Sequence, residues 1–288
     1  MQQITLRAAA KLNMTLDITG VRPDGYHLLQ MVMQTVSLYD TLTLRREERI
    51  SLLCDHLPNP DNLAWRAAEA FFAHTGVKGG VRITLDKQIP IQSGMAGGSA
   101  DAAAVLKGLD ILYETHLGLP ALRELGLSLG ADVPYCLMGG TALVEGIGEQ
   151  VIPVPQMRTG AFAILKPEWG VSTAAAFAAY DSGIPADRPN PYRVIDCLMK
   201  GKLKSVSPYM RNLLEQSADR YPEIAELRRR LLKNGALAAQ MTGSGSAVFG
   251  LFPDLAAAKA CAAAAARPDE LSFAAEPVPQ GVEVLLME

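Results

Sequence analysis

Hydrophobic residues recur along this chain at two spacings, every second position and every third or fourth position. Alternation over a short stretch predicts a strand, whereas the longer spacing predicts a helix. In the first half, strands are predicted at residues 2–8, 14–19, 32–45, 81–85 and 141–145, and helices at residues 61–75 and 119–129. Asp61 and Asn62 are candidates to cap the first of these helices, and Gly130 is expected to end the second.

The second half follows a connector at residues 153–160, which contains two prolines and a glycine. Strands are predicted there at residues 161–165, 248–252 and 282–287, and helices at residues 173–180, 192–200, 209–216, 223–234 and 255–266. The connector predicts two domains, residues 1–155 and 156–288. Because strands and helices are mixed without regular strand–helix–strand alternation, the predicted fold class is α+β.

A loop of small residues at positions 91–98 leads directly into a helical pattern. Gly94, Gly97 and Gly98 allow backbone conformations that other residues avoid and let a ligand approach the main chain closely. Ser99 is the expected N-cap, and apolar residues follow it at helical spacing at positions 102, 105, 106, 109 and 113. Free backbone N–H groups and the positive end of the helix dipole would meet there, so the loop is a candidate phosphate site.

The loop matches neither of the two commonest nucleotide-binding motifs. No lysine stands between Gly98 and Ser99, as a Walker A loop requires, and no Gly-x-Gly-x-x-Gly pattern follows a strand. A simple turn before a helix stays open as an alternative. Asp101 favours that alternative, because an acid in the first helical turn would repel a phosphate unless it faces away or a cation intervenes.

Composition excludes several classes of function. The chain has 288 residues, 49% of them hydrophobic, and a formal net charge of −3, so it lacks the basic field that draws nucleic acid or an anionic membrane. No apolar run approaches the length of a membrane span and no signal-peptide pattern begins the chain, so a cytoplasmic location is expected. The four cysteines and four histidines show no metal-ligand spacing.

Three further segments carry residues suited to chemistry. A second glycine loop, Thr242-Gly243-Ser244-Gly245, precedes a predicted strand and could close over a ligand, although a flexible turn is equally expected. Asp132 lies between Gly130 and Pro134, and this proline is expected to keep Val133 extended. Near the start of the chain, a predicted strand bears a lysine and an asparagine, and a turn bears a tyrosine and a histidine.

Taken together and in this order, these motifs resemble the GHMP kinase superfamily over residues 8–252. The motifs are Ala10-Lys11-Leu12-Asn13, Arg22-Pro23-Asp24-Gly25-Tyr26-His27, the loop and helix start at residues 89–103, Leu129-Gly130-Ala131-Asp132-Val133-Pro134, Glu145-Gly146-Ile147-Gly148-Glu149 and Thr242-Gly243-Ser244-Gly245. The resemblance implies a two-domain α+β fold with the active site in the cleft between the domains. It also implies ATP as phosphoryl donor, with Mg²⁺.

The tyrosine–histidine turn and the motif around Asp132 resemble most closely the superfamily members that phosphorylate the 2-hydroxyl of 4-diphosphocytidyl-2-C-methyl-D-erythritol, in non-mevalonate isoprenoid precursor synthesis. By this resemblance Lys11 and Asp132 would be catalytic, Tyr26 would stack on the cytosine and His27 would hydrogen-bond to it. The implied ATP contacts are Asn62, Ile91, Gln92, Ser93, Gly94, Met95, Ala96, Gly97, Gly98, Ser99 and Ala100, with Ser99 also a candidate Mg²⁺ ligand. The implied substrate contacts are Asn13, Tyr26, His27, Asp132, Thr173, Gly243 and Ser244.

Two other functions stay open at this stage. A different small-molecule kinase of the superfamily, of the homoserine or mevalonate type, would use the same phosphate loop, and Tyr26 with His27 argues against it. A nucleotide-binding regulator that has lost catalysis would not need both Lys11 and Asp132. The expected partners are therefore ATP and a small molecule, with no nucleic acid or membrane partner, and the expected assembly is a monomer or weak homodimer.

Overall fold

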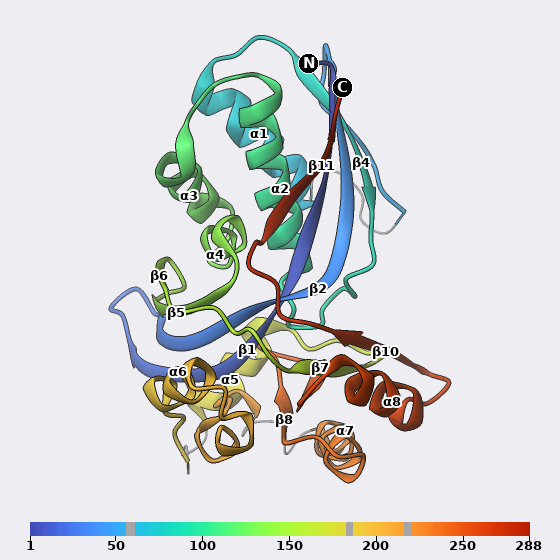
Figure 1. Cartoon of the computed structure of the whole chain (residues 1–288). Helices are drawn as coiled ribbons and strands as arrows, with labels where there is room; N and C mark the ends of the chain where they lie inside the picture. Colours follow the sequence, from blue (N-terminus) through green and yellow to red (C-terminus); the bar gives the residue numbers. More distant parts are fainter. Residues whose placement is uncertain (56–60, 183–186, 216–220) are drawn as a thin grey trace.

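The computed structural model of the chain describes residues 1–55, 61–182, 187–215 and 221–288, and these residues form two sheets with helices around them (Figure 1). The first sheet has seven strands, in the order β11-β1-β2-β4-β3, with β5 paired to β2 and β6 paired to β5. Its strands are β1 (Gln3–Val21), β2 (His27–Glu47), β3 (Ser51–Leu53), β4 (Gly80–Asp86), β5 (Thr141–Gly146), β6 (Gln150–Pro153) and β11 (Val282–Met287). The long antiparallel β1–β2 pair lies at the centre of this sheet.

Four helices accompany this sheet: α1 (Leu63–Thr75), α2 (Gly97–Leu112), α3 (Gly118–Leu129) and α4 (Val133–Met138). Helix α2 is the central one, since it packs on β1, β2, α1, α3 and α4. Its side chains are almost entirely buried, which suits the run of alanines that lets α2 approach its neighbours closely. The glycine loop that precedes α2 is thereby fixed to the core of this half.

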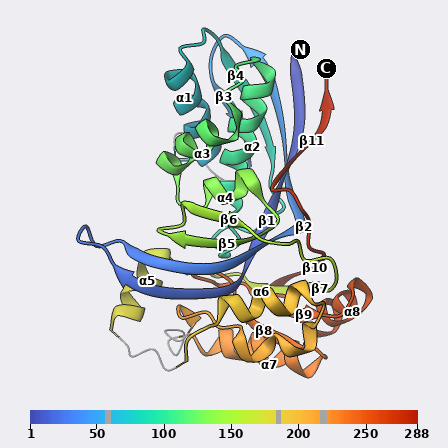
Figure 2. The same ribbon diagram turned by 60° about the vertical axis from the view of Figure 1, so that its left-hand side comes forward.

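The second sheet has four strands, in the order β10-β7-β9-β8. These are β7 (Ala161–Pro167), β8 (Ala238–Met241), β9 (Val248–Phe252) and β10 (Glu270–Ala275), with helices α7 (Pro222–Lys233) and α8 (Leu255–Ala265) packed on them. Helices α5 (Thr173–Asp181) and α6 (Pro191–Met199) complete this half, together with the 3₁₀ turns η1 (Leu203–Ser205) and η2 (Ser207–Tyr209). The two views show the β1–β2 pair curving from the first half along the second, where α6 packs on it (Figures 1 and 2).

The chain crosses between the sheets more than once. Strand β11 returns from the second half to pair with β1, so the C-terminus lies beside the N-terminus (Figure 1). The division near residue 155 falls between β6 and β7 and stays a prediction for the domain boundary. None of the described helices is both long and apolar enough to cross a membrane.

Most elements predicted from hydrophobic spacing are present, with shifted ends. The strands predicted at residues 2–8 and 14–19 are one continuous strand, because the polar residues between them are buried at the centre of the sheet. The helix predicted at residues 209–216 is wrong for the described residues 210–215, which form turns and an isolated bridge between Asn212 and Leu16. The last residue of this predicted helix, residue 216, lies outside the described structure. So do residues 183–186 of an exposed loop that three prolines predict at residues 183–191.

Two local predictions around the functional motifs are also wrong. Helix α2 begins at Gly97, and Ala96 occupies the N-cap position with a left-handed φ of 59°, so Ser99 is not the cap. Val133 is not extended, because α4 begins there. Pro134 is compatible with this helix since the first turn has no partner for its missing N–H group. Asn62, in contrast, does cap α1, through a hydrogen bond that its Oδ1 accepts from the Ala64 amide at 2.9 Å.

Candidate active site

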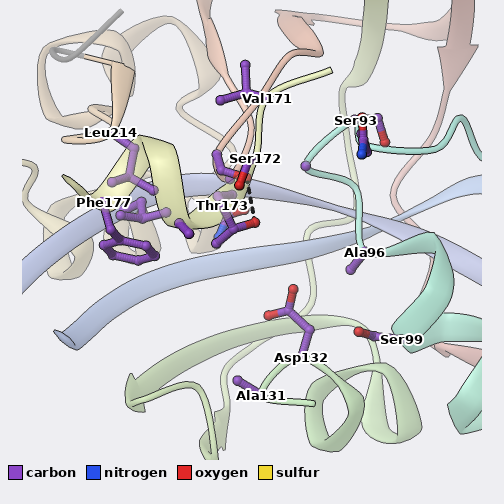
Figure 3. A pocket seen from close by; sticks show the side chains of 18 of the residues that line it. Ser93, Ala96, Ser99, Ala131, Asp132, Val171, Ser172, Thr173, Phe177 and Leu214 are labelled. Atoms are coloured by element: carbon purple, nitrogen blue, oxygen red, sulfur yellow. Dashed lines mark hydrogen bonds between the residues drawn. The ribbon is translucent and has the colours of Figure 1, made fainter. Parts of the chain in front are cut away.

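A cavity of about 1110 Å³ opens between the two halves of the molecule. This volume exceeds that of a pocket for one drug-sized ligand, roughly 300–1,000 Å³, and suits two ligands held side by side. Both halves line it, and the lining includes Lys11, Asn13, Tyr26, His27, Ile91, Gln92, Ser93, Gly94, Ala96, Gly97, Gly98, Ser99, Asp132, Thr173, Phe177, Asp181, Gly243 and Ser244. Figure 3 shows Asp132 and Ser99 on one side of this space, with Thr173 and Phe177 across from them.

The glycine loop places the start of α2 in the cavity wall. Gln92, Gly94 and Ala96 all have left-handed φ angles, of 50°, 76° and 59°, so the chain turns sharply before the helix begins. The Lys11 amide donates to the Met95 carbonyl at 3.1 Å, which joins the loop to the centre of β1. The first amides of α2 have no helical partner, and together with the helix dipole they form a seat for an anion.

The second glycine loop lies against the back of the first. The Ala247 amide donates to the Ser93 carbonyl at 3.2 Å, and the Thr242 hydroxyl donates to the Gly94 carbonyl at 3.3 Å. A Cβ atom at Gly94 would overlap the carbonyl oxygen of Thr242, so the main chains approach too closely for a side chain there. The two loops therefore form one rigid floor for the cavity.

Lys11 and Asp132 come together from distant parts of the chain. The Lys11 Nζ atom lies 3.8 Å from Asp132 Oδ2 and donates hydrogen bonds to Asn13 Oδ1 at 2.6 Å and to the Gly94 carbonyl at 2.7 Å. Lys11 is buried, whereas the Asp132 side chain keeps 34% of its surface exposed to the cavity. The pair thus provides a fixed ammonium beside a carboxylate that a ligand can reach.

An aromatic cluster forms the other end of the cavity. The His27 ring stacks on Phe177 with centroids 4.6 Å apart, and its Nε2 atom lies 2.7 Å from Asp181 Oδ1. Tyr26 lines the cavity and is 61% exposed. The Thr173 and Ser244 hydroxyls are 3.1 Å apart and join α5 to the second glycine loop. This end of the cavity suits a planar, polar ring.

Sequence reasoning missed Phe177 and Asp181. Both follow Thr173 at intervals of four residues and therefore lie on the same face of α5. Their four-residue spacing from Thr173 is the sequence signal that could have identified them as cavity residues. Three predicted ATP contacts do not line the cavity: Met95 and Ala100 are fully buried, and Asn62 is 2% exposed. Asn62 Nδ2 is buried and has no hydrogen-bond partner among the described residues.

Family models assign both halves of the molecule to one class of small-molecule kinase. The GHMP kinases N terminal domain matches residues 62–140, which include the first glycine loop and Asp132. The GHMP kinases C terminal domain matches residues 194–270, which include the second glycine loop. Together these two matches span more than half of the chain.

Curated relatives identify one family within this class of kinases. The 4-diphosphocytidyl-2-C-methyl-D-erythritol kinase of Alkaliphilus metalliredigens is 42% identical over 265 residues, which is 90% of this chain and 91% of the relative. The enzyme of the same name from Gloeobacter violaceus is 43% identical over 279 residues, 93% of this chain and 92% of the relative. The chain therefore belongs to the 4-diphosphocytidyl-2-C-methyl-D-erythritol kinase family of the GHMP kinases.

Solved structures agree with this assignment. A crystal structure of 4-(cytidine 5'-diphospho)-2C-methyl-D-erythritol kinase superposes with a TM-score of 0.82 at 33% identity, covering 94% of this chain and 98% of that one. Homoserine kinase from Cytophaga hutchinsonii superposes with a TM-score of 0.79 at 18% identity, covering 99% and 98% of the two chains. The second likeness shows a shared fold alone. The α+β, two-domain fold expected from the sequence is confirmed.

Replacing Gly94 with alanine is expected to impair ATP use selectively. The new Cβ would push the two glycine loops apart, and we expect the KM for ATP to rise at least about 10-fold, which corresponds to about 1.4 kcal/mol. Gly76→Ala is the matched control, because Gly76 also has a left-handed φ, of 67°, but meets no atom within 4 Å. Steady-state kinetics and melting temperatures of both variants measure the effect. A wild-type KM in Gly94→Ala would contradict the proposed contact between the loops.

Proposed function

We propose that this chain transfers the γ-phosphoryl group of ATP to the 2-hydroxyl of 4-diphosphocytidyl-2-C-methyl-D-erythritol, which gives the 2-phosphate and ADP. One observation carries the proposal. The amide-lined start of α2, the Lys11–Asp132 pair and the aromatic end at Tyr26, His27 and Phe177 all line a single cavity. A phosphate donor and a pyrimidine-bearing acceptor can therefore meet at the ammonium and the carboxylate.

Phosphoryl transfer asks the protein mainly to align the reactants and to balance charge on the transferring oxygens. Asp132 is placed to accept a hydrogen bond from the acceptor hydroxyl and to take its proton as the bond to phosphorus forms. Lys11 is placed to balance the negative charge that develops beside Asp132. Because Lys11 is held by Asn13 and by the Gly94 carbonyl, its ammonium is aligned before substrates bind.

ATP phosphates are proposed to bind the amides of Gly97, Gly98 and Ser99, with the second glycine loop facing them. The described residues contain no group of three histidine, cysteine or acidic side chains that could hold a metal by themselves. Mg²⁺ commonly uses one or two protein oxygens together with phosphates and water, so the Ser99 hydroxyl in this cavity fits that ion. When bound, Mg²⁺ would supply neutralisation of phosphate charge.

The cytosine of the acceptor is proposed to bind at the aromatic end. Tyr26 and Phe177 offer faces for stacking, and His27 offers ring nitrogens for hydrogen bonds. A carboxylate oxygen accepts hydrogen bonds, so Nε2 of His27 is the donor to Asp181 Oδ1 and Nδ1 of the neutral ring is left as an acceptor. Asn13 lies on β1 beside Lys11, where the polyol would lie, and Thr173 and Ser244 are further contacts from the second half.

The acceptor is identified by offering three alcohols in parallel. ADP release is measured with purified protein, ATP and Mg²⁺, using the diphosphocytidyl compound, mevalonate and homoserine as acceptors. We expect turnover with the diphosphocytidyl compound alone. Turnover on mevalonate or homoserine alone would replace this proposal with another kinase activity, and ATP binding without turnover would favour a regulator.

Asp132→Asn is expected to lower kcat by about 10²-fold to 10⁴-fold, the usual contribution of a positioned acid or base. The amide keeps the shape of the side chain but cannot take up the proton. The KM for ATP should stay within about threefold, because the phosphate seat is built from the main chain. Asp269→Asn serves as control, since Asp269 does not line the cavity. Near-wild-type turnover in Asp132→Asn would show that Asp132 does not act on the proton.

Tyr26→Ala and Phe177→Ala are each expected to weaken binding of cytidine 5′-diphosphate by about 5-fold to 100-fold, since one base–aromatic stack is worth about 1–3 kcal/mol. Affinity for ATP should not change. Tyr192→Ala is the matched control, because Tyr192 is as exposed as Tyr26, at 61%, and does not line the cavity. Calorimetric titration measures each affinity, and an unchanged affinity in both cavity variants would rule out the aromatic end as the cytosine site.

A further inference from the structure

A buried cluster of charges lies beneath the first glycine loop, outside the proposed machinery. Lys87 follows β4, and its Nζ atom contacts Asp40 Oδ2 at 2.5 Å and Asp101 Oδ2 at 2.6 Å. The side chains of Lys87, Asp40 and Asp101 are 5%, 0% and 3% exposed. Lys87, Asp40 and Asp101 form a buried Lys87 triad.

The triad joins both ends of the glycine loop to the first sheet. Asp40 lies on β2, and its second oxygen, Oδ1, accepts from the amides of Gln88 at 2.6 Å and Ile89 at 2.8 Å, where the loop begins. Asp101 lies in the second turn of α2, where the loop has ended. One ammonium thus sets the position of α2 relative to the start of the loop.

The same ammonium lies close to the proposed phosphate seat. Lys87 lines the cavity, and its Nζ atom lies 3.1 Å from the position that a Cβ atom would take at Gly97, the first residue of α2. Asp101 lies four residues further along α2, and its charge would oppose a phosphate at the helix start. The cation intervenes between the carboxylate and the seat.

The charges within the triad shift the pKa values of Lys87 and Asp101. Burial raises the pKa of Asp101 well above its usual value, because the attraction of Lys87 does not offset it and the charge of Asp40 raises it further. Burial acts to lower the pKa of Lys87, but the charges of Asp101 and Asp40 outweigh it, and the pKa of Lys87 is raised.

Stability alone does not account for such a cluster. Replacing a buried ion pair with apolar residues of similar volume is often neutral or stabilising, because burying charges is costly. Asp101 also retains a buried oxygen, Oδ1, without a hydrogen-bond partner among the described residues. Burying the Lys87 triad therefore costs free energy of folding, and its position at the proposed phosphate seat indicates a role in phosphate binding.

We propose that Lys87 is a positioning residue for phosphoryl transfer: it holds the glycine loop and α2 in register and neutralises Asp101 so that the amides of α2 can bind the ATP phosphates. The inference rests on the proposed function for the identity of the phosphate. Lys87 itself acts from beneath the loop and takes no part in proton transfer.

The charge role is tested with Lys87→Met and with Lys87→Met/Asp101→Asn. Affinity for ATP with Mg²⁺ is measured by calorimetry without acceptor. In Lys87→Met we expect affinity to fall by about 10-fold or more, because the negative charge of Asp101 then opposes the phosphates with no cation beside it. The double variant should recover most of the affinity.

A folded Lys87→Met variant with wild-type affinity for ATP, or a folded double variant that recovers no affinity, would overturn the charge role.

The positioning role is tested at Asp101 by two substitutions of similar size. Asn can still accept a hydrogen bond from Lys87, whereas Leu cannot. We expect Asp101→Asn to keep kcat within about threefold and Asp101→Leu to lower it by about 10-fold or more, a loss typical of misplaced reacting groups. Equal kcat values in these two variants would overturn the positioning role, and this comparison stays available if Lys87→Met does not fold.

A comparably buried ion pair far from the cavity provides the control. Arg230 of α7 and Glu270 of β10 lie 2.6 Å apart with side chains 10% and 8% exposed. Arg230→Met is expected to lower the melting temperature without changing ATP affinity. If wild-type protein binds ATP but does not phosphorylate the diphosphocytidyl acceptor, the proposed function fails, while the effect of Lys87 on ATP affinity still decides the present inference.

Discussion

The close approach of two glycine loops is the contact on which the rest of the site depends. Gly94 and Thr242 are far apart in the sequence, yet their main chains meet without room for a side chain at Gly94. This contact brings the proposed phosphate seat of the first half against the second half, and Lys11 joins it through the Gly94 carbonyl. A change in the distance between the loops would move the seat and the ammonium together.

Burial of polar groups on β1 makes the site and the fold interdependent. The Asn13 amide donates to the Thr242 hydroxyl at 3.1 Å, and the Gln240 side chain donates to the Asn13 carbonyl at 2.8 Å. These buried groups are satisfied only when the two halves meet, and leaving them unpaired would cost about 1–3 kcal/mol each. The two halves are therefore joined by buried polar groups on the same strand that carries Lys11.

Sequence patterns predicted secondary structure that depends on neighbouring residues. They failed where contacts between residues distant in the sequence determine the structure. Hydrophobic spacing located most helices and strands because burial of one face acts over a few residues. The helix predicted over residues 209–216 is replaced in its described part by turns, since Asn212 donates to the carbonyls of Met241 and Gly243 in the second glycine loop. Phe177 and Asp181 were missed because their partner His27 is about 150 residues away. Spacing rules cover only a few residues and cannot predict a contact between residues so far apart in the sequence.

Asp101 shows how such a distant contact can reverse an argument made from local sequence. An acid near the start of a helix counts against phosphate binding when only neighbouring residues are considered. The fold places Asp101 in the second turn, turns it into the core and pairs it with Lys87, which Asp40 also contacts from β2. The Asp101 side chain then serves as an anchor for a cation beside the helix start. The loop thus needs no Walker lysine in its own sequence to place an ammonium beneath the proposed phosphate seat.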